Sequence, residues 1–144
     1  MKDVVKNLWV AITLLVFLSG ILLVSDLGQR KTRIGNRDGY PRIAIMQFAS
    51  TPLLDTHVGG IISRLKESSH YAPDGSNVRI FNAQGDYGTA NAIARDIANG
   101  PWDLVITSST VALQVFAKAN QSVKKLHVFG AVTDPYGAGV GITG

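Results

Sequence analysis

Small polar side chains follow each of four short apolar segments that lie between residue 42 and the end of the chain. The segments cover residues 42–48, 77–81, 103–107 and 126–132. The hydroxyl, amide and carboxylate residues that follow them are Ser50, Thr51, Asn82, Gln84, Asp86, Ser108, Ser109, Thr110, Thr133 and Asp134. These groups can hydrogen-bond a small polar ligand, and in open α/β sheets ligands bind beyond the carboxyl ends of the strands. The pattern therefore predicts a site for a small polar molecule.

Two of these groups have a more specific interpretation. Ser108, Ser109 and Thr110 precede a helix predicted from Val111, where unpaired backbone N–H groups favour a carboxylate or phosphate. One of the three hydroxyls is equally expected to cap that helix. Asp134 can pair with a ligand ammonium, although an Asp-Pro turn with Pro135 also accounts for it.

The elements that must position these groups alternate between two hydrophobic patterns. The four apolar segments have the length and composition of buried strands. Apolar residues at helical spacing lie between them, over residues 54–69, 90–98 and 111–119. Strand–helix alternation with short loops predicts an α/β fold with a doubly wound parallel sheet and helices on both faces.

Several kinds of chemistry lack the residues that they need. The chain has no cysteine, so thiolate metal sites, disulfides and a cysteine nucleophile are excluded. His57, His70 and His127 are not spaced as metal ligands, and we expect them to face solvent or to pack. No nucleophile-elbow motif is present. We therefore expect no enzyme activity, no metal and no cofactor.

The N-terminal part has a different composition. Leu8 to Val24 is almost continuously apolar, which predicts a signal anchor or transmembrane helix within residues 1–28. A secretory signal peptide, cleaved to release the protein to the periplasm, is the alternative. Residues 29–40 form a basic tether. From Pro41 onward, eight Lys/Arg face seven Asp/Glu, so this part is nearly neutral and no nucleic-acid partner is expected.

Three segments resemble one family of binding proteins. The stretches Asn82-Ala83-Gln84-Gly85-Asp86 and Phe129 to Pro135, together with the turn 107–110, resemble the ABC-transporter substrate-binding proteins, which include aromatic amino-acid binders. The resemblance runs from about Arg42 to the end. It implies a periplasmic-binding-protein type I-like lobe, a ligand held between two lobes, and delivery to ABC permease subunits. By motif position it implies a ligand site formed by Ser50, Thr51, Ser108, Ser109, Thr110, Thr133 and Asp134.

These observations define the expected organisation. Residues 41–144 form one substrate-binding lobe, and the resemblance implies a second lobe of similar size that this sequence does not contain. We expect the lobe to be anchored to the cell membrane. The resemblance implies that it lies on the extracytoplasmic side, although the four Lys/Arg that closely follow the apolar run weakly favour the opposite orientation. The ligand is expected to be an amino acid or a similar small polar solute. A membrane-tethered lobe that senses a ligand for a signalling system is the alternative function.

Overall fold

The computed structural model describes residues 39–141. The predicted anchor over residues 1–28 and the tether up to residue 38 lie outside the described residues. Within the described part, none of the helices is both long and apolar enough to cross a membrane.

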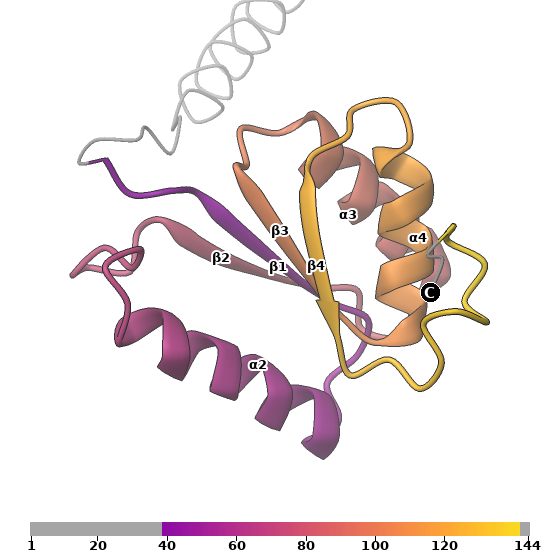
Figure 1. Cartoon of the computed structure of the whole chain (residues 1–144). Helices are drawn as coiled ribbons and strands as arrows, with labels where there is room; N and C mark the ends of the chain where they lie inside the picture. Colours follow the sequence, from indigo (N-terminus) through magenta and orange to yellow (C-terminus); the bar gives the residue numbers. More distant parts are fainter. Residues whose placement is uncertain (1–38, 142–144) are drawn as a thin grey trace, which may run out of the picture. The chain divides into compact units, whose positions relative to one another are not determined.

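Four parallel strands form one sheet, in the order β2-β1-β3-β4 (Figure 1). The strands are β1 (Ile43–Gln47), β2 (Val78–Asn82), β3 (Leu104–Ser108) and β4 (Leu126–Gly130). The two central strands, β1 and β3, are almost entirely buried, which explains their continuous apolar sequences. The register aligns the last residues of all four strands in one row. The predicted doubly wound parallel sheet is thus confirmed.

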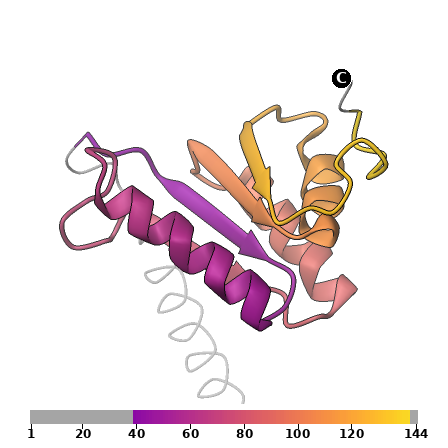
Figure 2. The same cartoon turned by 60° about the horizontal axis from the view of Figure 1, so that its bottom comes forward.

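Three helices connect the strands and cover both faces of the sheet. They are α2 (Pro52–Lys66), α3 (Tyr87–Asn99) and α4 (Thr110–Asn120). Figures 1 and 2 show α2 alone on one face, whereas α3 and α4 pack together on the other. Each helix is preceded by an N-cap residue whose side chain accepts a hydrogen bond from a first-turn N–H: Thr51, Asp86 and Ser109.

The core beneath α2 is formed by alternate residues of the strands. Ile43, Ile45 and Ile106 are buried against Val58 of α2, because residues two apart point to the same face of a strand. The other face holds Met46, Val105 and Thr107 under α3 and α4. Each central strand is therefore fixed by two ladders of hydrogen bonds, one to each neighbouring strand, and by an apolar layer on each face.

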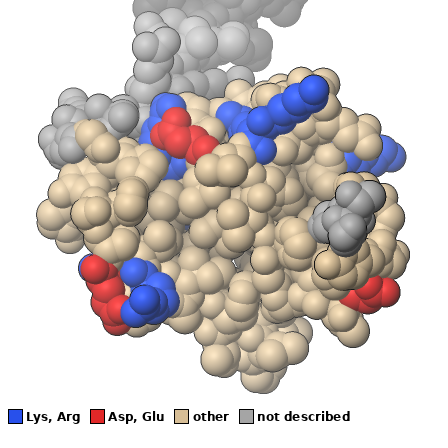
Figure 3. Space-filling model, viewed as in Figure 1, with Lys and Arg blue, Asp and Glu red and all other residues tan. Residues whose placement is uncertain are grey.

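A single helix does not cover the whole of its face. Ile80, Leu126 and Val128 lie on the α2 face by strand alternation and are 46%, 66% and 49% exposed. Figure 3 shows the surface between α2 and β4 without Lys, Arg, Asp or Glu. A hollow of about 850 Å³ runs beside α2, with Ile43 and Leu104 among its lining residues. This apolar face lies along the strands rather than at their carboxyl ends.

The element boundaries differ from the sequence prediction by a few residues. β3 includes Ser108, which the sequence placed in the following loop, and β4 ends at Gly130 rather than at residue 132. Ala131 has a φ of 53°, so the extended backbone stops there. α2 ends at Lys66 rather than near residue 69.

Candidate functional site

The last residues of the four strands form a row across the sheet, called the polar row because three of the four, Asn82, Gln47 and Ser108, have polar side chains. Asn82 pairs with Gln47, Gln47 with Ser108, and Ser108 with Gly130 in the parallel register. All four positions point toward the face covered by α2, because they continue the alternation of Ile45 and Ile106. The carboxyl edge of the sheet therefore begins with hydrogen-bonding groups where the apolar core ends.

Buried Gln47 connects this row to the first turn of α2. Its Nε2 donates to the carbonyl oxygen of Ala49 at 2.8 Å and to Asp55 Oδ1 at 2.6 Å. Asn82 makes the neighbouring connection, because its Nδ2 donates to Ser50 Oγ at 2.9 Å. The loop that contains Ser50 and Thr51 is thus held from below by two strands.

Ser108 has the most enclosed position in the row. Its side chain is fully buried, and its Oγ lies 2.9 Å from His57 Nδ1. His57 comes from the second turn of α2 and lies over the end of β4, where a Cβ at Gly130 would overlap the ring. The hydroxyl of Ser108 therefore links β3 to α2 in the interior and is not accessible to solvent.

Three of the four non-glycine residues with positive φ in the described part of the chain lie in the loops at the same edge; the fourth, Lys124, precedes β4 at the opposite edge. Gln84, Ser109 and Ala131 have φ values of 54°, 109° and 53°, and they follow β2, β3 and β4 respectively. Residues other than glycine rarely adopt a positive φ. With a ψ of 157° as well, Ser109 lies in a region of φ and ψ that is used almost only by glycine. Such residues persist where surrounding contacts hold them, and they gather at ligand sites and active sites.

The N-termini of all three helices also meet this edge. Thr51 Oγ1 accepts from the N–H of Leu54, and Ser109 Oγ accepts from the N–H of Ala112. Asp86 Oδ1 accepts from the N–H of Thr89 at 2.6 Å, and this hydrogen bond lowers the pKa of the Asp86 carboxyl. The positive ends of three helix dipoles thus lie beside the polar row, an arrangement that favours anionic groups.

Asp134 lies in the loop after β4 and is exposed. Its Oδ1 accepts from the N–H of Gly137 at 2.9 Å, so the carboxylate closes a turn. A Cβ at Gly137 would overlap the Asp134 carboxylate. The exposed Thr133 precedes Asp134, so a hydroxyl and a carboxylate lie next to each other in this loop.

Aromatic rings border two of the loops. Tyr87, at the start of α3, is exposed and packs its ring 5.0 Å from that of Phe48, the residue after β1. Tyr136 is exposed in the loop after β4. Aromatic surface is therefore available beside the polar row.

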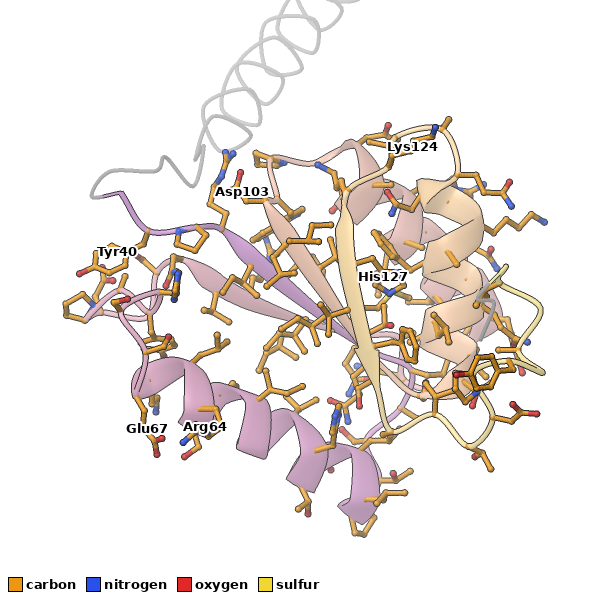
Figure 4. The ribbon with its side chains drawn as sticks, viewed as in Figure 1. Tyr40, Arg64, Glu67, Asp103, Lys124 and His127 are labelled. Atoms are coloured by element: carbon orange, nitrogen blue, oxygen red, sulfur yellow. The ribbon has the colours of Figure 1, made fainter. Side chains whose placement is uncertain are left out.

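Another histidine, His127, is the second residue of β4, and its side chain points toward α4, away from the edge (Figure 4). Its Nε2 is 2.9 Å from Thr107 Oγ1, and its ring packs edge-on against Phe116. Burial lowers the pKa of His127 to about 4. This residue belongs to the packing of the sheet rather than to the site.

All seven residues predicted for the site lie at this edge: Ser108 ends β3, Thr110 begins α4, and the other five lie in loops. Ser50, Thr51, Thr133 and Asp134 are at least partly exposed, Ser109 and Thr110 are half-buried, and Ser108 is fully buried. Gln47, Asp55 and His57 also belong to this edge, where their hydrogen bonds hold the strand ends and the loop after β1, but no sequence motif indicated them. A usable sequence signal short of a motif nevertheless existed for them: Gln47 is a polar residue at the end of an apolar strand, and Asp55 and His57 are polar residues in the first two turns of the next helix.

The fold is a doubly wound α/β lobe, and proteins of this fold class bind their ligands beyond the carboxyl ends of the strands. The chain can be assigned to a family within this class. Residues 42–142 match the family model described as ABC transporter substrate binding protein. The protein therefore belongs to the ABC transporter substrate binding protein family, as the resemblance predicted.

Individual relatives agree with this assignment. The chain is 33% identical over 100 residues to a tyrosine-binding protein of Clostridioides difficile (strain R20291), covering 68% of this chain and 28% of that protein. It resembles the crystal structure of an ABC domain from Streptococcus pneumonia in complex with L-Trp, with a TM-score of 0.62 and 30% identity over 69% of this chain and 32% of that one.

A third relative is a ligand-free, open substrate binding protein with adhesive properties from Clostridium difficile. The TM-score is 0.63 and the identity 28%, over 69% of this chain and 33% of the other. The chain thus spans about a third of the length of the relatives that it matches. These relatives are substrate-binding proteins rather than enzymes.

Proposed function

We propose that this chain is a lobe of an extracytoplasmic solute-binding component of an ABC transporter, and that its solute is an aromatic amino acid or a similar small zwitterion. The observation that carries the proposal is the convergence at one sheet edge: a row of polar strand ends, three strained residues and three helix N-termini. Relatives whose names state tyrosine and L-Trp as ligands support the choice of solute.

The two charges of an amino acid have complementary groups at this edge. The Ser109–Thr110 turn, at the start of α4, is the place for the carboxylate, since helix N-termini favour anions. We place the ammonium at Asp134. One of its oxygens holds the Gly137 turn, and in this proposal the other oxygen accepts a hydrogen bond from the ammonium. The exposed ring of Tyr87 provides apolar contact for an aromatic side chain.

A single lobe contacts such a ligand from one side only. Closure of two lobes normally excludes water and adds contacts, so we propose that this chain alone binds weakly, with a Kd on the order of 1 mM. At such affinities, the order in which different ligands bind tests which groups of the solute are recognised. L-Tryptophan and L-tyrosine should bind more tightly than L-alanine, tryptamine or indole-3-propionate, each of which lacks one of the three recognised groups.

The ranking is measured by NMR titration of the full chain, kept soluble in a mild detergent because of the apolar run Leu8 to Val24. Equal binding of tryptamine and L-tryptophan would contradict the carboxylate site. Equal binding of indole-3-propionate would contradict the ammonium site. Equal binding of L-alanine would contradict the aromatic preference.

We further propose that residues 1–28 anchor the protein in the cell membrane with the lobe outside the cytoplasm, where solute is collected. Alkaline phosphatase fused to the C-terminus is active only after export. An active fusion in the membrane fraction is the expected result. An inactive fusion, together with a fluorescent cytoplasmic reporter at the same position, would contradict this orientation.

A further inference from the structure

His57 contacts the ends of two neighbouring strands from a third element. Its Nδ1 lies 2.9 Å from the Oγ of Ser108, the last residue of β3. Its ring also lies against Gly130, the last residue of β4, where an added Cβ would overlap Nε2 and lie 2.6 Å from Cε1. One side chain of α2 thus binds β3 by a hydrogen bond and β4 by close packing.

The buried hydroxyl of Ser108 depends on this contact. Ser108 is 0% exposed, and the imidazole is the partner that the structure gives its Oγ. A buried hydroxyl without a partner is costly, so removal of the ring would displace Ser108 or admit water. Residue 130 must be a glycine because the imidazole ring occupies the space that a side chain would fill.

Ser109, one of the three residues with positive φ at this edge, is held by the two residues that His57 touches. It follows Ser108 directly, and its N–H donates to the carbonyl oxygen of Gly130 at 3.2 Å. With φ 109° and ψ 157° it also caps α4 through the N–H of Ala112. A residue in this region of φ and ψ keeps its conformation only if its neighbours are fixed.

We propose that His57 is a positioning residue: it fixes Ser108 and Gly130, and thereby holds the Ser109–Thr110 turn in the conformation that receives the solute carboxylate. The role of the turn in receiving the carboxylate rests on the proposed function. The role of His57 in fixing Ser108 and Gly130 does not, because it concerns contacts within the described residues. His57 itself does not touch the solute in this account.

Two substitutions separate the hydrogen bond of His57 from its bulk. His57→Asn places a side-chain amide atom near the position of Nδ1, so the bond to Ser108 can form. His57→Leu is similar in size and cannot form it. His70→Leu, at an exposed histidine beyond the other end of α2, is the matched control.

Amide hydrogen exchange of the full chain in detergent measures the turn directly. In His57→Leu, the Ser109 amide should exchange about tenfold faster than in the parent, as expected for loss of one net hydrogen bond. His57→Asn and His70→Leu should stay near the parent rate, and the Ile97 amide in α3 should not change in any variant. An unchanged Ser109 rate in His57→Leu, or equal rates in the Leu and Asn variants, would overturn the proposal.

If His57→Leu does not fold, two further variants test whether the contacts of His57 hold the Ser109–Thr110 turn. Ser108→Ala removes the same hydrogen bond from the strand and should accelerate the Ser109 amide in the same way. Gly130→Ala should disturb the turn strongly in the parent and much less when combined with His57→Ala, which vacates the space. Equal effects of Gly130→Ala with and without the ring would overturn the packing contact.

The NMR titration with L-tryptophan then links the turn to binding. His57→Leu should weaken binding about tenfold and His57→Asn should restore it. If the parent binds and His57→Leu binds equally well, His57 does not position the site. If the parent does not bind at all, the proposed function fails for this chain, while the exchange rates still decide whether His57 holds the turn.

Discussion

The amide of Gln47 donates to the carboxylate of Asp55 across 2.6 Å, and this bond joins the buried end of β1 to the exposed first turn of α2. A second bond from the same Nε2 atom, to the carbonyl oxygen of Ala49, holds the intervening loop. The loop with Ser50 and Thr51 therefore owes its shape to one buried side chain rather than to its own sequence.

Gln47→Glu should destabilise the protein through charge repulsion. The new carboxylate cannot donate to either partner and lies beside Asp55, so about 2 kcal/mol of unfolding free energy should be lost at pH 7. Burial and the Asp55 charge should raise the folded-state pKa of the introduced carboxyl above its unfolded value. The variant is therefore least impaired below about pH 4.3 and loses stability as the pH rises.

Urea denaturation at pH 4.5 and pH 7 measures this difference. Gln47→Met, which carries no charge, is the matched control and should show the same deficit at both pH values. A pH-independent deficit in Gln47→Glu would contradict the repulsion.

His127 should make stability fall in mildly acidic solution. Its folded-state pKa is lowered to about 4 by burial, against an unfolded value of about 6.5. The stability that comes from burying the neutral His127 ring is therefore fully present above pH 6.5 and is lost progressively as the pH falls toward 4. Because the ring is only partly buried, we expect a loss of about 1–2 kcal/mol rather than the full linkage value.

Thermal unfolding between pH 7 and pH 4.5 tests the role of His127 against His127→Gln. Glutamine keeps a polar group near Thr107 but does not titrate in this range. The variant should lose the part of the pH dependence that His127 contributes, while other carboxyl groups continue to titrate. Identical pH profiles for the parent and the variant would show that another group is responsible.

The uncovered apolar face should contribute little to stability compared with the core beside it. Val128 is 49% exposed, whereas its register partner Ile106 is 8% exposed and packs under α2. Val128→Ala should cost less than about 1 kcal/mol, and Ile106→Ala about 2–4 kcal/mol. Chemical denaturation of both variants gives the comparison. Equal losses would mean that Val128 is covered in solution.

Asp134→Asn should weaken solute binding without unfolding the loop. Asparagine can still accept from the N–H of Gly137, so the turn and the melting temperature should be preserved. Loss of the charge-assisted bond to the ammonium should weaken L-tryptophan binding about tenfold. Binding that remains at the parent level, with an intact turn, would leave Asp134 with a structural role only.

The strand and helix pattern was predictable because each element buries a continuous or periodic set of apolar side chains. Ile43, Ile45 and Ile106 fill one layer, and the helix of residues 87–99 lays its alanines against the other side. The polar loops were predictable for the same reason, since they begin where each apolar segment ends. Parallel strands then bring these loops to one edge.

The supports of the site were not predictable from local sequence. His57 and Ser108 are 51 residues apart, and their contact depends on the strand order β2-β1-β3-β4, which no local pattern encodes. Ser108 was expected in a loop, because a serine beside two other hydroxyl residues has no apolar signal to place it in a strand. The positive φ of Ser109 also lacks a signal, because strained positions are usually glycine.

The location of bound L-tryptophan tests the central claim most directly. Amide chemical shifts of the full chain in detergent are followed while L-tryptophan is added to well above the expected Kd of about 1 mM. We predict that the shifts which change belong to residues 49–51, 84–87, 108–110 and 131–137, and that amides at the amino ends of the strands, such as Asp103, do not move. Shifts confined to the apolar face beside α2, or no change at any amide, would contradict the assignment of the carboxyl edge as the solute-binding site.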